Sequence, residues 1–149
     1  MALRRIGGVL WIVSAFLDRA DGELARLGGQ TSTSGHLYDY VCDLTVNSLL
    51  FLAIGIGLRH SALDGWAIVL GILSAASVAA ASLFSEQLER QEKSGRKAYV
   101  GYFGFDFDDV LYLFGPIAWL GWFLPVLVGA AVGAPAIALW TWIRLRRKR

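Results

Sequence analysis

Four aspartates near the start of the chain are the residues best suited to chemistry. Asp18 and Asp21 are three positions apart, and Asp39 and Asp43 are four positions apart. In a helix either spacing places both side chains on one face. The four lie beside long apolar runs, where ionisable groups are costly and indicate function. Four carboxylates brought together would repel one another unless cations bound among them.

Carboxylate oxygens are the ligands that Mg²⁺ and Mn²⁺ prefer, so the four aspartates predict a site for two such ions. Two metals are suited to phosphoryl transfer, because they polarise phosphate oxygens and neutralise the leaving group. Nearby residues fit a phosphate ligand, since Gly22 and Gly35 permit close approach, Ala25 keeps the helix face thin and Arg26 offers a planar fork. The alternative for each aspartate, taken singly, is a juxtamembrane charge that faces the cytoplasm.

The elements that carry these residues are expected to be membrane helices. The 149 residues are 56% hydrophobic and 17% charged, and the charges form a few clusters between long uncharged runs. About 20 apolar residues cross a bilayer as a helix, so the chain has room for about five spans. We expect an all-α, polytopic transmembrane helical bundle that forms a single membrane-embedded domain over residues 1–149. The one cysteine, Cys42, is expected to be a buried packing residue.

The apolar runs and their breaks define the expected spans. Gly28 and Gly29 follow the first run as a stop signal. The middle of the third span is rich in Ala and Ser, which lets membrane helices approach closely. The expected helices are residues 7–27, 35–58, 63–84 with a polar extension to 91, 105–120 and 124–143.

The last two helices are separated only by a predicted turn. Residues 110–143 contain no charge, and as one helix they would be roughly 50 Å long, far more than a bilayer needs. Gly121, Trp122 and Pro125 supply the expected turn. Pro116 and Pro135 then fall inside the fourth and fifth spans as kinks.

The distribution of basic residues predicts the orientation. Residues 19–26, 90–97 and 144–149 hold eleven Lys and Arg, whereas the opposite side holds Arg4, Arg5 and Arg59. The side rich in Lys and Arg should be cytoplasmic. Tryptophans near the span ends are expected to form interfacial belts. We therefore expect an integral protein of a bacterial or archaeal cell membrane, with the aspartates on the cytoplasmic side.

The spacing of the motif extends over both of the first two helices. Residues 18–43 read DRADGELARLGGQTSTSGHLYDYVCD, which is DxxDGxxAR, eight residues, and then GxxxDxxxD. This pattern resembles, at every fixed position, the signature of the CDP-alcohol phosphotransferase family. The resemblance implies a dimeric membrane transferase of phospholipid biosynthesis, usually with six spans. Such an enzyme moves a phosphoalcohol group, often phosphatidyl from CDP-diacylglycerol, to an acceptor alcohol and releases CMP; no nucleic-acid partner is expected.

The resemblance also implies a role for each motif residue. Asp18, Asp21 and Asp39 would hold one metal ion, with Asp18, Asp39 and Asp43 around a second. Asp43 would also be the catalytic base that takes the proton of the acceptor hydroxyl. The residues implied to contact the CDP-alcohol, or to leave room for it, are Gly22, Ala25, Arg26, Ser32 and Gly35.

The acceptor is less determined by the sequence. Arg90, Lys93, Arg96 and Lys97 could bind a phosphorylated acceptor, or they could orient the protein against anionic lipid. An acidic cluster opens the expected fourth helix, either as helix N-terminal charges or as part of the acceptor site. That cluster is Asp106, Asp108 and Asp109.

Two alternative functions belong to classes other than active enzymes. Only 17 residues precede Asp18, whereas the family usually has a complete span there, so we expect a missing first span. A catalytically inactive membrane subunit, or a truncated homologue that keeps the metal and nucleotide site, is therefore an alternative. A metal-dependent transporter would need polar residues through the bilayer centre, and the later spans offer few.

Overall fold

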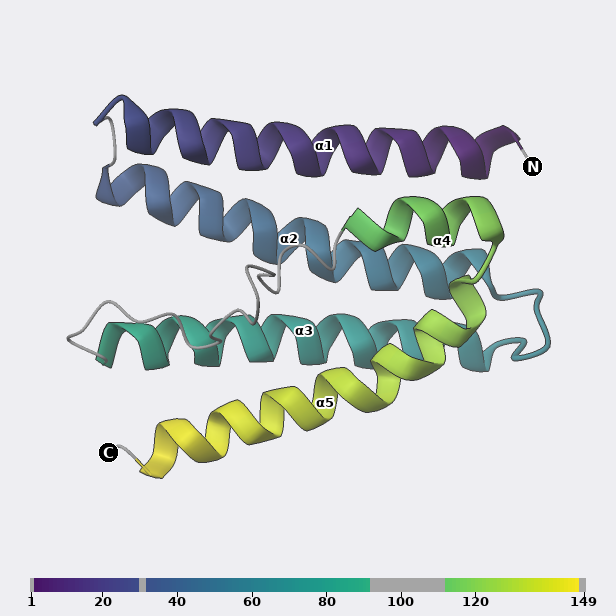
Figure 1. The fold of residues 1–149 in the computed structure, drawn as a ribbon. Helices are drawn as coiled ribbons and strands as arrows, with labels where there is room; N and C mark the ends of the chain where they lie inside the picture. The colour runs from purple at the N-terminus through teal and green to yellow at the C-terminus, as the bar shows by residue number, and fades with distance from the viewer. Residues whose placement is uncertain (1, 30–31, 92–111, 148–149) are drawn as a thin grey trace. The chain divides into compact units, whose positions relative to one another are not determined.

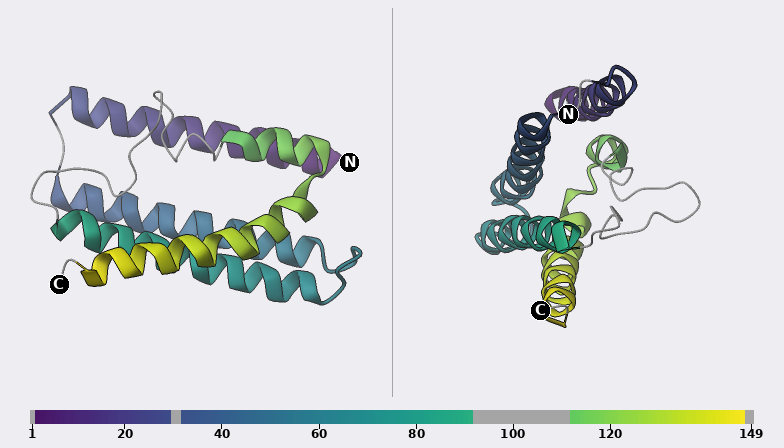
Figure 2. Two further views of the ribbon diagram at one scale, coloured as in Figure 1. Left: turned by 60° about the horizontal axis from the view of Figure 1, so that its bottom comes forward. Right: turned by 90° about the vertical axis from the view of Figure 1, so that its left-hand side faces the viewer.

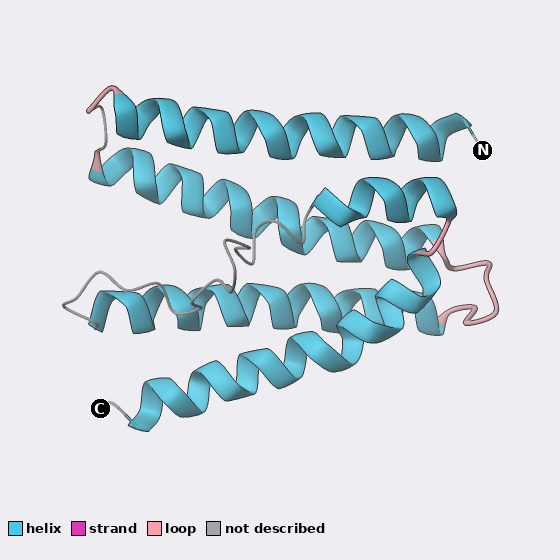
Figure 3. Cartoon of the chain, in the orientation of Figure 1, coloured by secondary structure: helices cyan, strands magenta, loops and turns pink. Residues whose placement is uncertain are grey.

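The computed structural model describes residues 2–29, 32–91 and 112–147. This part of the chain is helical and has no strand, as Figures 1 and 3 show, so the predicted all-α class is confirmed. The helices are α1 (Ala2–Leu27), α2 (Thr33–Gly57), α3 (Trp66–Gln91), α4 (Phe114–Leu120) and α5 (Phe123–Arg147).

Three of these helices are long and apolar enough to cross a membrane. They are Ser34–Gly57 of α2, all of α3 and all of α5. Large side chains such as Val69, Ile72 and Val132 are exposed along α3 and α5, as expected of surfaces that face lipid rather than water. The chain is therefore a helical membrane protein. Spans formed by α1 and by residues 105–120 stay predictions.

The helix limits differ from the predicted ones by a few residues. The first helix begins at Ala2 rather than at residue 7, and it ends before Gly29, whose positive φ of 63° stops it as predicted. The third begins at Trp66 rather than at residue 63. Leu63 instead belongs to a turn, in which its N–H donates to Ser61 Oγ at 3.3 Å. The extension of the third helix to Gln91 is confirmed.

The predicted break between the last two helices lies where the sequence places it. Gly121 ends α4 with a φ of 74°, and the Trp122 N–H returns to the Ile117 carbonyl at 3.1 Å. Pro125 lies in the first turn of α5, where no N–H is needed for the helix. Pro116 also lies in the first turn of the described helix α4, rather than deep inside a span. Residues 105–111 of the predicted fourth span lie outside the described residues.

The chain divides into two compact units, here called the first unit (residues 1–40 and 101–122) and the second unit (residues 41–100 and 123–149). In the first unit α4 packs against α1, which two further views in Figure 2 also show. A side chain added at Gly8 would meet Trp119 Nε1 at 2.7 Å and the Gly115 carbonyl at 3.1 Å. The two glycines therefore allow the helices to approach closely.

In the second unit, α3 packs against α5, and each of the two helices carries a stripe of buried residues. The buried residues of α3 and of α5 recur at helical spacing, so each set makes one stripe along its helix. Leu88 and Leu145, with Phe84 beside them, close the far end of the contact. The buried residues are Ala67, Gly71, Ser74, Ser77 and Leu88 on α3, and Leu127, Ala131, Ala138, Thr141 and Leu145 on α5.

Within the same unit, α2 approaches α3 through a pair of glycines. A Cβ placed on Gly55 would lie 2.6 Å from the Ala67 carbonyl oxygen and 2.9 Å from Gly71 Cα. These partners are backbone atoms, which cannot move away by a change of side-chain rotamer. The two helices therefore touch backbone to backbone, as the small-residue composition of the third span predicts.

Candidate active site

The first half of the motif lies on the last turns of α1. Asp18 and Asp21 are both exposed, and their spacing places them on one face of the helix. The helix continues one residue further through a hydrogen bond from the Gly28 N–H to the Leu24 carbonyl at 2.9 Å. Both carboxylates therefore project from regular helix rather than from a loop.

Gly22 of the motif lies in open space, as Gly7 near the start of the same helix also does. Among the described residues, no atom lies within 4 Å of a Cβ placed on Gly22, and its φ is not positive. Neither packing nor backbone conformation therefore requires glycine at this position. Glycine inside a helix costs roughly 1 kcal/mol relative to alanine. A ligand that approaches the backbone closely would account for it, as the sequence predicts.

A helix N-cap precedes the second half of the motif. Ser32 Oγ accepts a hydrogen bond from the Gly35 N–H at 3.0 Å, and Ser32 lies immediately before α2. This is the geometry of a helix N-cap, which satisfies one of the free N–H groups of the first turn. The structure thus gives Ser32 a structural role in addition to the predicted contact with the nucleotide.

The second pair of aspartates lies on the first turns of α2. Asp39 and Asp43 are exposed and one turn apart, so they share a face of the helix. Asp39 belongs to the first unit, together with Asp18 and Asp21, whereas Asp43 belongs to the second. Cys42, between them, is half-buried rather than fully buried.

The donor set fits a hard divalent cation, because all four candidates are carboxylates and each pair has the one-turn spacing that lets two oxygens face one ion. Among the described residues, no three His, Cys, Asp or Glu side chains lie close enough together to hold a metal ion. Convergence of the four aspartates stays a prediction.

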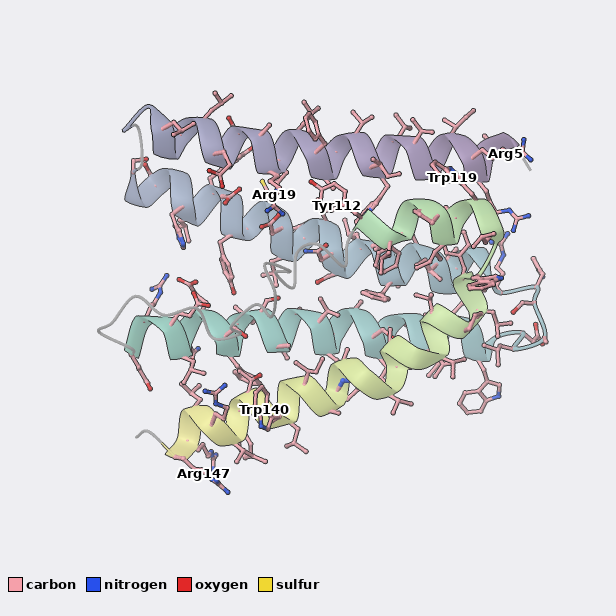
Figure 4. The ribbon with its side chains drawn as sticks, in the orientation of Figure 1. Arg5, Arg19, Tyr112, Trp119, Trp140 and Arg147 are labelled. Atoms are coloured by element: carbon pink, nitrogen blue, oxygen red, sulfur yellow. The ribbon has the colours of Figure 1, made fainter. Side chains whose placement is uncertain are left out.

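Two side chains, one just before α4 and one on it, donate hydrogen bonds to the backbone of α1. The Tyr112 hydroxyl donates to the Ala15 carbonyl at 3.1 Å, one turn before Asp18. At the other end, Trp119 Nε1 donates to the Arg5 carbonyl at 3.3 Å. Figure 4 labels Tyr112, Trp119 and Arg5 in this region. The sequence prediction assigned Trp119 only to an interfacial belt and did not identify Tyr112.

Of the predicted acceptor residues, the structure describes only Arg90. Its Nε donates to Glu86 Oε1 at 2.8 Å, one turn earlier on α3, and its side chain is 68% exposed. Arg90 is thus engaged with a neighbour on its own helix. The side chain of Arg26, although on α1, is outside the described part of the structure. Also outside it are Lys93, Arg96, Lys97, Asp106, Asp108 and Asp109.

Comparison with known proteins identifies the family. A family model described as CDP-alcohol phosphatidyltransferase matches residues 3–142. The bifunctional IPC transferase and DIPP synthase of Rubrobacter xylanophilus is 35% identical over 71 residues, which are 46% of this chain and 16% of that relative. The chain therefore covers only a small part of that relative's length. No solved structure matches the chain significantly. Because the family match runs from the start of α1 nearly to the end of α5, the chain belongs to the CDP-alcohol phosphatidyltransferase family.

Proposed function

We propose that this protein transfers a phosphoalcohol group, in particular phosphatidyl from CDP-diacylglycerol, to an acceptor alcohol and releases CMP. The observation that carries the proposal is the complete motif, with four exposed carboxylates at the end of α1 and in the first turns of α2, and an open Gly22 among them. Membership of the family supports the same reaction class. In the cell this reaction would belong to phospholipid biosynthesis.

In the proposed mechanism, Asp43 takes the proton of the acceptor hydroxyl. The acceptor oxygen attacks the phosphorus that bears the retained alcohol. A P–O bond forms to the acceptor while the P–O bond to the CMP portion breaks, so CMP leaves as the second product. Two Mg²⁺ or Mn²⁺ ions held by the four aspartates would supply positive charge to the pyrophosphate.

The nucleotide would lie against the end of α1. Gly22 and Ala25 leave the helix surface thin there, and Gly35 does the same at the start of α2. Arg26 would offer its guanidinium to phosphate or ribose oxygens. Ser32 would hold the first turn of α2 as its N-cap whether or not it also contacts the nucleotide.

The test follows CMP release from CDP-diacylglycerol in the presence of Mg²⁺ or Mn²⁺. The acceptor panel contains serine, glycerol phosphate, inositol, inositol phosphate and choline. We expect release with one of these acceptors and loss of release when a chelator removes the metal. Silence across the panel would instead favour the catalytically inactive subunit.

Asp43→Asn tests the base assignment. General-base catalysis contributes on the order of 10²- to 10⁴-fold, so turnover should fall by at least that lower factor while CDP-diacylglycerol still binds. Asp64→Asn is the matched control, because Asp64 is exposed in the loop between α2 and α3 and its φ of 46° suits asparagine equally well. Near-normal turnover in Asp43→Asn would contradict the assignment.

We also propose that the aspartates face the cytoplasm and that the enzyme acts as a homodimer. The excess of Lys and Arg on that side supports the orientation, and the resemblance to the family supports the dimer.

Since Cys42 is the only cysteine, a Cys42→Ala background allows site-specific labelling. A membrane-impermeant maleimide added to intact cells should label Ala62→Cys but not Ser34→Cys; the reverse pattern would refute the orientation. Light scattering of the purified protein tests the dimer.

A further inference from the structure

The end of α5 carries aromatic and basic residues whose arrangement is set by its packing on α3. Thr141 is 1% exposed and Leu145 is 4% exposed, and Leu145 packs with Leu88 and Phe84 of α3. Thr141 also turns its hydroxyl back to the Ile137 carbonyl at 2.8 Å, so it presents no free polar group to the contact. Thr141 and Leu145 therefore mark the inward face of this end of the helix.

Two arginine–tryptophan pairs flank that inward face. The Arg144 guanidinium lies 4.8 Å from the centre of the Trp140 ring, and that of Arg146 lies 4.2 Å from the Trp142 ring. At about 100° per residue, the two pairs lie roughly 100° to either side of the Thr141–Leu145 face. Figure 4 labels Trp140 at this end of α5.

The outward face of α5, between the two pairs, changes from apolar to basic towards the end of the helix. Leu139 and Ile143 are exposed by 56% and 38%, and Arg147 is exposed one turn beyond Ile143. Apolar side chains thus lie on the bilayer side of this surface, and guanidinium groups lie at its end. A matching ligand needs an anionic head and apolar chains.

The stacking determines where the guanidinium groups are held. Tryptophan rings at the end of a membrane helix sit at the level of the lipid headgroups. A guanidinium stacked on such a ring is kept at that level, and stacking uses its face rather than the N–H groups around its edge. Those N–H groups match two phosphate oxygens at once.

We propose that the surface formed by Trp140, Trp142, Arg144, Arg146 and Arg147 binds the phosphate of anionic phospholipids in the adjacent leaflet. Leu139 and Ile143 contact the upper acyl chains of the same lipids. The proposed lipid site shares no residue with the four aspartates, and the proposal does not depend on the proposed enzymatic function.

The test measures lipid selectivity of the full chain in vesicles of phosphatidylcholine mixed with phosphatidylglycerol. Spin-labelled phosphatidylglycerol and spin-labelled phosphatidylcholine report, by electron paramagnetic resonance, the fraction of each lipid held at the protein surface. We expect the wild type to prefer phosphatidylglycerol several-fold. Arg144→Gln with Arg146→Gln and Arg147→Gln should remove most of this preference, and free inorganic phosphate should not displace the lipid.

The matched control removes three arginines that the sequence predicts on the opposite membrane face, Arg4, Arg5 and Arg59. It should keep the preference; an equal loss in both triple variants would show that net charge alone attracts the lipid and would overturn the proposal. Arg146→Gln with Arg147→Gln changes only exposed side chains, so it provides a second variant if the triple change affects folding. Absence of any preference in the wild type would also overturn the proposal.

Discussion

Replacing Gly55 by alanine tests the backbone contact between α2 and α3. The added Cβ would lie 2.6 Å from the Ala67 carbonyl oxygen, whereas ordinary contacts begin at 3.4 Å. The helices must therefore separate by about 0.8 Å at this point, and the neighbouring contacts lose part of their dispersion energy. Overpacking of this kind costs about 1–3 kcal/mol. Gly71→Ala should cost less, because its closest contacts, at 3.0 Å, are longer.

The assay is reversible unfolding in mixed micelles with increasing denaturing detergent, followed by far-ultraviolet circular dichroism. Alanine also favours the helix over glycine by about 1 kcal/mol, which would mask part of the effect. Gly129→Ala on α5 supplies the correction, since no described atom lies within 4 Å of a Cβ at Gly129. The free energy of unfolding of Gly55→Ala should be lower than that of Gly129→Ala by about 1–3 kcal/mol. Equal stabilities would refute the inferred close contact.

Three further predictions use the same unfolding assay. Tyr112→Phe removes the hydrogen bond to the Ala15 carbonyl and should cost about 0.5–1.5 kcal/mol; no change would mean that this bond does not hold α1. Leu88→Ala should cost about 2–5 kcal/mol because Leu88 is fully buried, whereas the control Leu83→Ala, at a 45% exposed position, should cost much less. Ser32→Asp should keep the stability, because aspartate caps a helix as well as serine does. A raised KM for the CDP-alcohol in Ser32→Asp would show that the residue also faces the nucleotide. An unchanged KM would mean that Ser32 acts only as the N-cap of α2.

The helix order and the principal turns could be predicted because they depend on local chemistry. Gly29 and Gly121 adopt positive φ, a conformation that only glycine reaches at little cost, and both end helices where the sequence places a break. The start of α3 was predicted three residues too early. Leu63 extends the apolar run, but a turn around Asp64, with its φ of 46°, removes it from the helix. Hydropathy alone does not report the hydrogen bonds of such a turn.

The partners of small residues could not be predicted, because they lie far apart in the chain. Gly8, Gly22 and Gly55 look alike in the sequence, since each lies within an expected helix or next to it. The structure separates them: Gly8 meets Trp119 and Gly115, Gly55 meets backbone atoms of α3, and Gly22 meets no described atom within 4 Å. Only the third therefore lacks a packing explanation. The space around Gly22 thus separates it from Gly8 and Gly55, but Gly7 and Gly129 are equally open, so its place in the motif is also needed to mark it as ligand-facing.

The first half of α1 contacts α4, and its second half carries the motif. Substitutions in the two halves should therefore affect different properties, stability in the first and turnover in the second. The Tyr112 contact at Ala15 lies one turn before Asp18, and the Trp119 contact at Arg5 lies near the start of the helix. Both contacts are made to backbone carbonyls of α1 and not to the aspartate side chains. Changes at the α1–α4 contact should therefore lower stability and leave turnover per folded molecule nearly constant. Changes at the aspartates should do the opposite, because their side chains are exposed and contribute little to packing.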